Sequence, residues 1–420
     1  MNSYKYISII LFFQFFCPDY AIDSGSDSLN LFLPYVKHYF VFIMCSVYFF
    51  KSLVLFKSSF INFISNKFSI ILFLILLYYL YSFFFFDFSR YDMVDNFTVT
   101  SIIFPLYLFS IFFEKVDFDR VIQTFLFFSK FSVIFMFFEL ISFFLIKNPY
   151  SFSPYNGSFH SVIFQNLQIV SLICNIVFAN SLYFILNSKS KSINIYNLFL
   201  ILISIIVCYY TFNRTSLLLF VFISYFLIFK VKGKSSILFY SILFVLLIYV
   251  ASYFVVDFET SNAQKGDLSD LSSLSIRLLL LFVGFKVLLT NWLVGVGPFL
   301  IDHSMAETVQ NLYANDIYLA LLTLSKNTTL DEGIWTSHPH FAFLNVWLNF
   351  GILGFLIYFK VFKILFKSLK NNTKKLILPN CILLILLSHN FFYPQLYWEF
   401  LFLFVLYIIF INQKYNFKRT

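Results

Sequence analysis

The sequence predicts an all-α integral membrane protein with about 12 transmembrane helices and one large, partly helical loop on the non-cytoplasmic side. Three observations support this fold class. Hydrophobic residues make up 60% of the 420 positions and charged residues only 12%, which lies far outside the composition of soluble domains. Apolar runs long enough to cross a bilayer recur along the chain. Lysine and arginine residues gather in alternate loops between these runs.

A window of about 19 residues locates the apolar runs in order. The first is short enough to be a signal-peptide core, but no small-residue cleavage site follows it, and the rest of the topology is the same whether it is cleaved or retained. The runs lie near 6–17, 31–50, 68–86, 98–113, 121–146, 162–187, 198–213, 215–231, 236–256, 341–362, 376–393 and 396–411. We therefore expect transmembrane helices 1 to 9 in 1–256, a large loop in 257–340, and helices 10 to 12 with a tail in 341–420.

Positive charge sets the predicted orientation, because cytoplasmic loops are enriched in lysine and arginine. The intervening loops are poor in lysine and carry aspartates instead. Both termini are therefore predicted to be cytoplasmic. The net charge of +9 follows from this topology, so no nucleic-acid partner is needed to explain it. The basic loop residues are Lys51, Lys57, Lys67, Lys115, Arg120, Lys189, Lys191, Lys230, Lys232, Lys234, Lys367, Lys370, Lys374, Lys375, Lys414, Lys418 and Arg419.

The loop from 257 to 340 differs from all the others in its length, and loops this long are usually functional. Within it, SSLSIRLLLLFVGFKVLLTNW at 272–292 has the length and the serine-rich start of a helix. Such a helix would suit the membrane interface. The motif GVGP at 295–298 predicts a turn directly after it.

Two arginines on the non-cytoplasmic side need an explanation. Arg214 lies in a very short turn between two apolar runs, where a guanidinium costs roughly 2.5–3.5 kcal/mol unless it snorkels or finds an anion. Arg277 opens the loop helix. One interpretation is local: Arg214 snorkels beside Asn213 and Thr215, and Arg277 marks the polar face of an interfacial helix. The other is an anion site, in which both make bidentate contacts to one diphosphate, as a lipid-linked sugar diphosphate would present.

The stretch SHPHFAFLNVWLNFGILGF at 337–355 places two histidines before an apolar run that contains two glycines. Pro339 disfavours helix at His338 and positions His340 just before the run, at the outer mouth of that span. A neutral imidazole there can take a proton from a sugar hydroxyl as a general base. The alternative is a pair of interfacial histidines with no chemistry. Gly351 and Gly354 would allow close helix approach.

No metal or cofactor is indicated by the sequence. The cysteines lie in or beside apolar runs without metal-ligand spacing, and neither a metalloprotease motif nor a nucleotide-binding loop occurs. The remaining histidines likewise lack partners at ligand spacing. These residues are His38, His160, His303 and His389, with Cys17, Cys45, Cys174, Cys208 and Cys381.

Four motifs follow one another in an order that resembles the O-antigen ligase and polymerase superfamily of membrane glycosyltransferases, which includes the Wzy type. They are FNRTSLLL, SIRLLLLF, NWLVGVGPF and SHPHFAFLNVWLNFGILGFL, and the resemblance covers about residues 200–365. The two arginines of the family match Arg214 and Arg277, and its loop histidine best matches His340. This sequence differs from the family pattern at two positions: Phe341 stands in place of an asparagine, and Asn349 stands in place of an acidic residue. This leaves His338 as a secondary candidate for the base.

The resemblance implies metal-independent inverting glycosyl transfer at the periplasmic face of the bacterial inner membrane, with an undecaprenyl-diphosphate-linked glycan as donor. We expect this transfer to polymerise undecaprenyl-diphosphate-linked O-antigen repeat units. Arg214 and Arg277 would hold the diphosphate and His340 would activate the acceptor hydroxyl. The partners implied are the lipid-linked oligosaccharide, the bilayer, a chain-length regulator and a flippase.

Three alternatives stay open. A ligase would pass the glycan to lipid A core, and the phenylalanine-rich composition, as in AT-rich O-antigen gene clusters, favours the polymerase. A flippase of the lipid-linked unit would suit twelve spans, but no internal repeat is present and few charges fall within the spans. A purely structural or regulatory membrane protein would tolerate replacement of both arginines.

Overall fold

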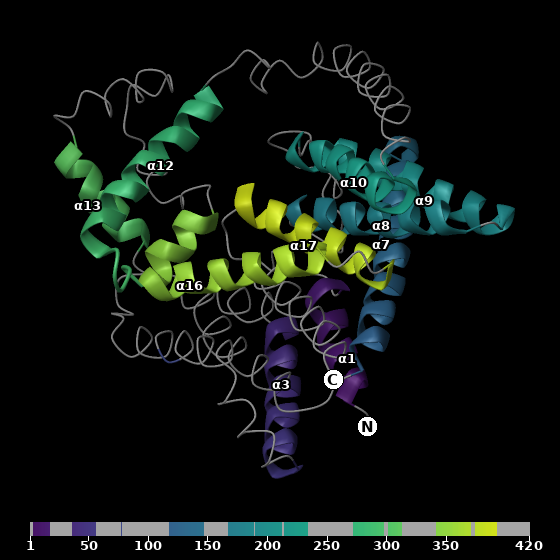
Figure 1. Ribbon diagram of the computed structural model, residues 1–420, viewed down its shortest axis with the longest axis horizontal. Coiled ribbons are helices and arrows are strands. Elements are labelled where there is room, and N and C mark those ends of the chain that lie inside the picture. The colour runs from purple at the N-terminus through teal and green to yellow at the C-terminus, as the bar shows by residue number, and fades with distance from the viewer. Residues whose placement is uncertain are drawn as a thin grey trace.

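The computed structural model describes residues 3–16, 36–55, 77, 117–146, 167–188, 190–211, 214–233, 272–297, 301–312, 342–370 and 374–392. Every regular element among these residues is α-helical, which confirms the predicted all-α class. The helices are α1 (Ser3–Phe16), α3 (Val36–Leu55), α7 (Phe118–Ile146), α8 (Leu167–Asn187), α9 (Lys191–Tyr210), α10 (Arg214–Lys232), α12 (Ser272–Asn291), α13 (Ile301–Leu312), α16 (Ala342–Lys370) and α17 (Lys374–Phe392) (Figure 1).

Three of the described helices are long and apolar enough to cross a membrane: Asp119–Ser142, Ile169–Asn187 and Lys191–Tyr210. Shorter apolar stretches occur in α1, α12, α16 and α17. The predicted apolar runs near 68–86, 98–113, 236–256 and 396–411 lie outside the described residues, apart from Leu77. The expected total of about 12 transmembrane helices, the three-part division of the chain and the placement of its loops therefore stay predictions.

The larger of two hydrophobic cores is built around α8. Every residue from Ile169 to Ser181 is buried, as expected for a helix enclosed by others on all sides. Helix α8 contacts α7, α9, α10 and α17, while α1 contacts both α3 and α7. By contrast, α9 buries one face and exposes apolar side chains such as Leu202 on the other. We call these seven helices, α1, α3, α7, α8, α9, α10 and α17, the bundle.

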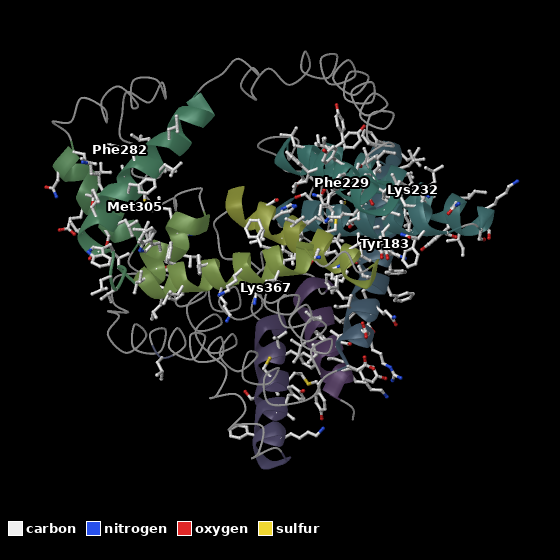
Figure 2. The ribbon with its side chains drawn as sticks, viewed as in Figure 1. Tyr183, Phe229, Lys232, Phe282, Met305 and Lys367 are labelled. Atoms are coloured by element: carbon white, nitrogen blue, oxygen red, sulfur yellow. The ribbon has the colours of Figure 1, made fainter. Side chains whose placement is uncertain are left out.

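The second core joins α12, α13 and the first part of α16, here called the loop-helix unit. Its buried side chains include Leu280 and Val283 of α12, Met305 of α13, and Leu344 and Leu348 of α16. Figure 2 labels Met305 and its neighbour Phe282, at the end of the molecule away from α9. Helix α16 also contacts α17, and this contact links the two cores (Figure 1).

The structure corrects the prediction for the apolar run at 341–362, which we expected to be one continuous span. Helix α16 is interrupted at Gly351, whose φ of 53° and ψ of −139° are not helical. The chain therefore changes direction nine residues after α16 begins. The first part of the helix packs on α12 through Leu344 and Leu348, and α16 also contacts α17.

Candidate functional site

The backbone of two predicted site residues is described. Arg214 is the first residue of α10, and Arg277 lies in the second turn of α12, so each arginine stands near the start of a helix, as the sequence predicted. The side chains of both arginines lie outside the described part of the structure, as do His338 and His340 entirely. The roles assigned to these four residues stay predictions. The structure instead shows how the helices that carry or follow them are joined.

The turn after α12, residues 292–297, is inserted into the break of α16. The backbone N–H of Val296 donates to the carbonyl of Leu348 at 2.7 Å, and the N–H of Ile352 donates to the carbonyl of Leu293 at 3.0 Å. In an unbroken helix the N–H of Ile352 would have donated to the carbonyl of Leu348. Two hydrogen bonds to the turn therefore replace one intrahelical hydrogen bond. The carbonyl of Leu348 and the N–H of Ile352, which the break would leave unpaired, each have a partner in the turn.

Side chains reinforce this junction. The indole Nε1 of Trp347 donates to the carbonyl of Trp292 at 2.9 Å, across 55 residues of sequence. The ring of Trp347 also lies against Phe355, with 5.6 Å between ring centroids. Because Trp347 precedes the break and Phe355 follows it, this contact holds the two parts of α16 at a fixed angle.

Glycine is required on both sides of the junction. Gly295 and Gly351 have φ values of 80° and 53°, in the left-handed region that glycine adopts without a steric penalty. A Cβ at Gly351 would collide with the carbonyl of Leu293, and a Cβ at Gly295 would collide with the carbonyl of Leu348. We call the paired segments around Gly295 and Gly351 the glycine junction.

The two glycines of the 337–355 stretch thus have different roles from the helix–helix approach expected of them. Gly351 admits the backbone of a turn rather than a second helix. Gly354 faces its own helix, because a Cβ there would collide with the carbonyl of Val346. Eight residues separate these positions, about 12 Å in a straight helix, so their proximity is a direct result of the break.

Asn349 occupies the position where the resembled family has an acidic residue. It is 3% exposed, and its amide Nδ2 donates to the carbonyl of Asn345 at 2.8 Å and lies 3.1 Å from the Oδ1 of the same residue. A carboxylate in so enclosed a place would carry a large desolvation cost. A neutral amide avoids this cost.

A buried polar pair in the bundle was missed by sequence reasoning. Asn175 of α8 and His389 of α17 are both at most 1% exposed, and Nδ2 of Asn175 donates to Nε2 of His389 at 3.1 Å. The two residues are 214 positions apart, so no local motif signals the contact. The only available signal was a histidine inside an apolar run. Among the described residues, no group of three metal-ligating side chains is present.

Residues 199–359 match the family Wzy_C, described as O-antigen ligase. The matched segment begins in α9 and contains Arg214, Arg277, both candidate histidines and the whole glycine junction. It agrees closely with the stretch over which the sequence motifs resemble this superfamily. A search of curated proteins and of solved structures finds no match. The O-antigen ligase domain at residues 199–359 therefore supports membership of the chain in the O-antigen ligase and polymerase family.

Proposed function

We propose that this protein polymerises undecaprenyl-diphosphate-linked O-antigen repeat units at the periplasmic face of the bacterial inner membrane. The family match supports a polymerase or a ligase, and the long apolar helices support a membrane protein. The observation that carries the proposal is the glycine junction. It ties the helix of Arg277 to the helix that directly follows His340, within the matched domain.

The direction of the two helices supports a shared site. The turn at 292–297 follows the C-terminal end of α12, and the break at Gly351 ends the first part of α16. Because the two helices are joined at these ends and pack together in one core, their N-terminal ends extend from the same junction. Figure 1 shows α12 and the first part of α16 converging on one corner of the molecule. Arg277 is in the second turn of α12, and α16 begins two residues after His340 in the sequence, which supports assigning both to one site.

In the proposed reaction, Arg214 and Arg277 bind the diphosphate of the donor. His340 takes the proton of the acceptor hydroxyl, whose oxygen attacks the anomeric carbon as the bond from that carbon to the diphosphate oxygen breaks. The leaving group is undecaprenyl diphosphate, and the two guanidinium groups stabilise the negative charge that develops on it. Attack from the face opposite the leaving group inverts the anomeric configuration. The donor's own phosphoester bond supplies the driving force.

The test is deletion of the gene in its host, followed by electrophoresis of the lipopolysaccharide. A polymerase predicts lipid A core carrying one repeat unit and no ladder. Wild-type protein should restore the ladder, while Arg214→Ala and His340→Ala should reduce it by at least about 100-fold, since general-base catalysis alone contributes that much. Arg120→Ala is a matched control, because Arg120 is an exposed arginine paired with Asp117 at 3.0 Å. A ladder that survives deletion unchanged would contradict the proposal.

A ligase is the second candidate, because the match to a family described as O-antigen ligase supports a ligase as well as a polymerase. It would use the same donor and the same diphosphate site, but its acceptor would be lipid A core. The electrophoresis separates the two, because loss of a ligase leaves core with no repeats while polymer collects on the lipid carrier.

A further inference from the structure

A cavity of about 420 Å³ lies between four helices of the bundle, within the range of about 300–1,000 Å³ that is usual for small-molecule sites. Its walls come from one face of α7, from α8 and α9, and from the start of α17. Tyr183, labelled in Figure 2, is one of the α8 residues. This cavity is separate from the loop-helix unit and from the glycine junction, neither of which contributes a lining residue.

The cavity is amphipathic, and its polar groups are unusual for the interior of a membrane bundle. Leu126, Phe127 and Ile382 supply apolar walls, whereas Lys130 and Asn180 supply a cation and an amide. Asn180 is 1% exposed, and neither its Nδ2 nor its Oδ1 has a hydrogen-bond partner among the described residues. A buried amide without partners costs roughly 1–3 kcal/mol, so a ligand that satisfies it gains a corresponding advantage.

Lys130 presents the same need for a partner. Its ammonium lies 5.4 Å from the ring centroid of Phe184, but no carboxylate within the described ranges forms an ion pair with it. The nearest acidic lining residue along α7 is Asp119, which is exposed and lies 11 residues away, about 16 Å along the helix. A cation within an apolar span is expected to bind an anion. The lining therefore offers a ligand the ammonium of Lys130 and the amide of Asn180, together with one carboxylate, Asp119.

Charged residues at the ends of the surrounding helices predict the side of the membrane on which the cavity lies. Helices α9 and α17 both begin with lysines, Lys191 and Lys374, and Arg120 stands at the start of α7. Basic residues at these ends predict the cytoplasmic side. Asn180 lies seven residues before the end of α8, near the same side. The cavity is thus predicted to lie near the cytoplasmic leaflet, on the other side of the membrane from the predicted glycosyl-transfer site.

We propose that this cavity binds an anionic phospholipid of the cytoplasmic leaflet. The headgroup phosphate accepts hydrogen bonds from the Nζ of Lys130 and the Nδ2 of Asn180, and an acyl chain lies along the exposed ring of Phe127, toward the bilayer. Basic pockets between transmembrane helices on the cytoplasmic side suit such headgroups. Charge complementarity favours this ligand, because the ammonium of a zwitterionic headgroup would repel Lys130, and Asp119, about 16 Å away along α7, is too distant to offset that repulsion.

The test uses the full-length protein in detergent, with native mass spectrometry to measure bound lipid. Phosphatidylglycerol should bind at least about 10-fold more tightly than phosphatidylethanolamine or phosphatidylcholine of the same chain length. Lys130→Gln should abolish this preference, and Lys130→Arg should retain it. Asn180→Leu should weaken phosphatidylglycerol binding while leaving the protein at least as thermally stable as wild type, since it removes an unsatisfied amide.

Lys230→Gln is the matched control, because Lys230 also lies over an aromatic ring, 5.9 Å from the centroid of Phe229, but does not line the cavity. It should bind phosphatidylglycerol as wild type does. Equal binding of phosphatidylethanolamine, or an unchanged preference in Lys130→Gln, would overturn the proposal. A competition experiment with glycerol 1-phosphate separates a lipid from a soluble phosphate. If glycerol 1-phosphate displaces the lipid at equal concentration, the site binds soluble phosphates and the lipid assignment is wrong.

Discussion

The bundle and the loop-helix unit are held together by different means. In the bundle, side chains pack around α8 over its whole buried length from Ile169 to Ser181, and many small contacts share the stability. In the loop-helix unit, an apolar core is supplemented by backbone hydrogen bonds between Leu293–Val296 and Leu348–Ile352. The bundle should therefore lose stability gradually when its residues are changed, whereas the loop-helix unit should depend on a few positions.

The largest effect is expected from Gly351→Ala. Strain at a positive φ costs about 1–3 kcal/mol, and overlap of the new Cβ with the carbonyl of Leu293 adds about 1–3 kcal/mol or more. We expect a total loss of about 4 kcal/mol from these two terms. The loss should appear as a lower Tm of the purified protein and as loss of the lipopolysaccharide ladder.

Gly233→Ala is a matched control for that variant. Gly233 also has a positive φ, 88°, but a Cβ there would meet no atom within 4 Å. Its cost should be limited to the conformational strain, about 1–3 kcal/mol. If both variants lower Tm equally, close approach of the turn contributes nothing and the contrast between the two regions fails.

An intermediate effect is expected in the bundle from Ile173→Ala. Ile173 is fully buried in α8, and truncation to alanine leaves a cavity that costs about 2 kcal/mol or more. Leu202→Ala on α9 removes a side chain that is 52% exposed and should change Tm little. A Tm measurement on both variants checks this, and similar losses would argue against α8 as the centre of the core.

The smallest effect is expected from Trp347→Phe, which keeps an aromatic ring against Phe355 but removes the Nε1 donor to the carbonyl of Trp292. One such hydrogen bond contributes about 0.5–1.5 kcal/mol. Trp292→Phe should be neutral, because Trp292 accepts through its backbone and its side chain is 53% exposed. A larger drop in Tm for Trp292→Phe than for Trp347→Phe would assign the stabilisation to packing instead.

The sequence predicts some of these structural features and not others. Hydropathy and charge locate helices well, and the loop helix expected at 272–292 is α12, Ser272–Asn291. Helix α13 was not predicted, although Ile301, Met305 and Val309 recur at helical spacing. Its many polar residues keep its mean hydropathy below that of a membrane span. The break at Gly351 was also missed, since hydropathy does not report φ.

Contacts distant in sequence were beyond prediction for a physical reason. The pairing of His389 with Asn175, and that of Trp347 with Trp292, depend on how separate helices dock. Each residue alone looks like an ordinary member of an apolar run. The candidate site divides in the same way: the order of Arg214, Arg277 and His340 can be read from the chain, whereas the junction that connects α12 with α16 cannot.

The hydrogen bonds between the turn and the break at Gly351 also determine the order in which the loop-helix unit can assemble during synthesis. The turn at 292–297 is synthesised before its acceptor at Leu348, so the N–H of Val296 and the carbonyl of Leu293 must remain solvated until α16 has been synthesised. Closing the intervening segment then carries the entropic cost of a loop of about 50 residues. The loop-helix unit is thus expected to fold late, only once α16 has formed, and a chain that stalls before Leu348 would leave α12 unanchored at its C-terminal end.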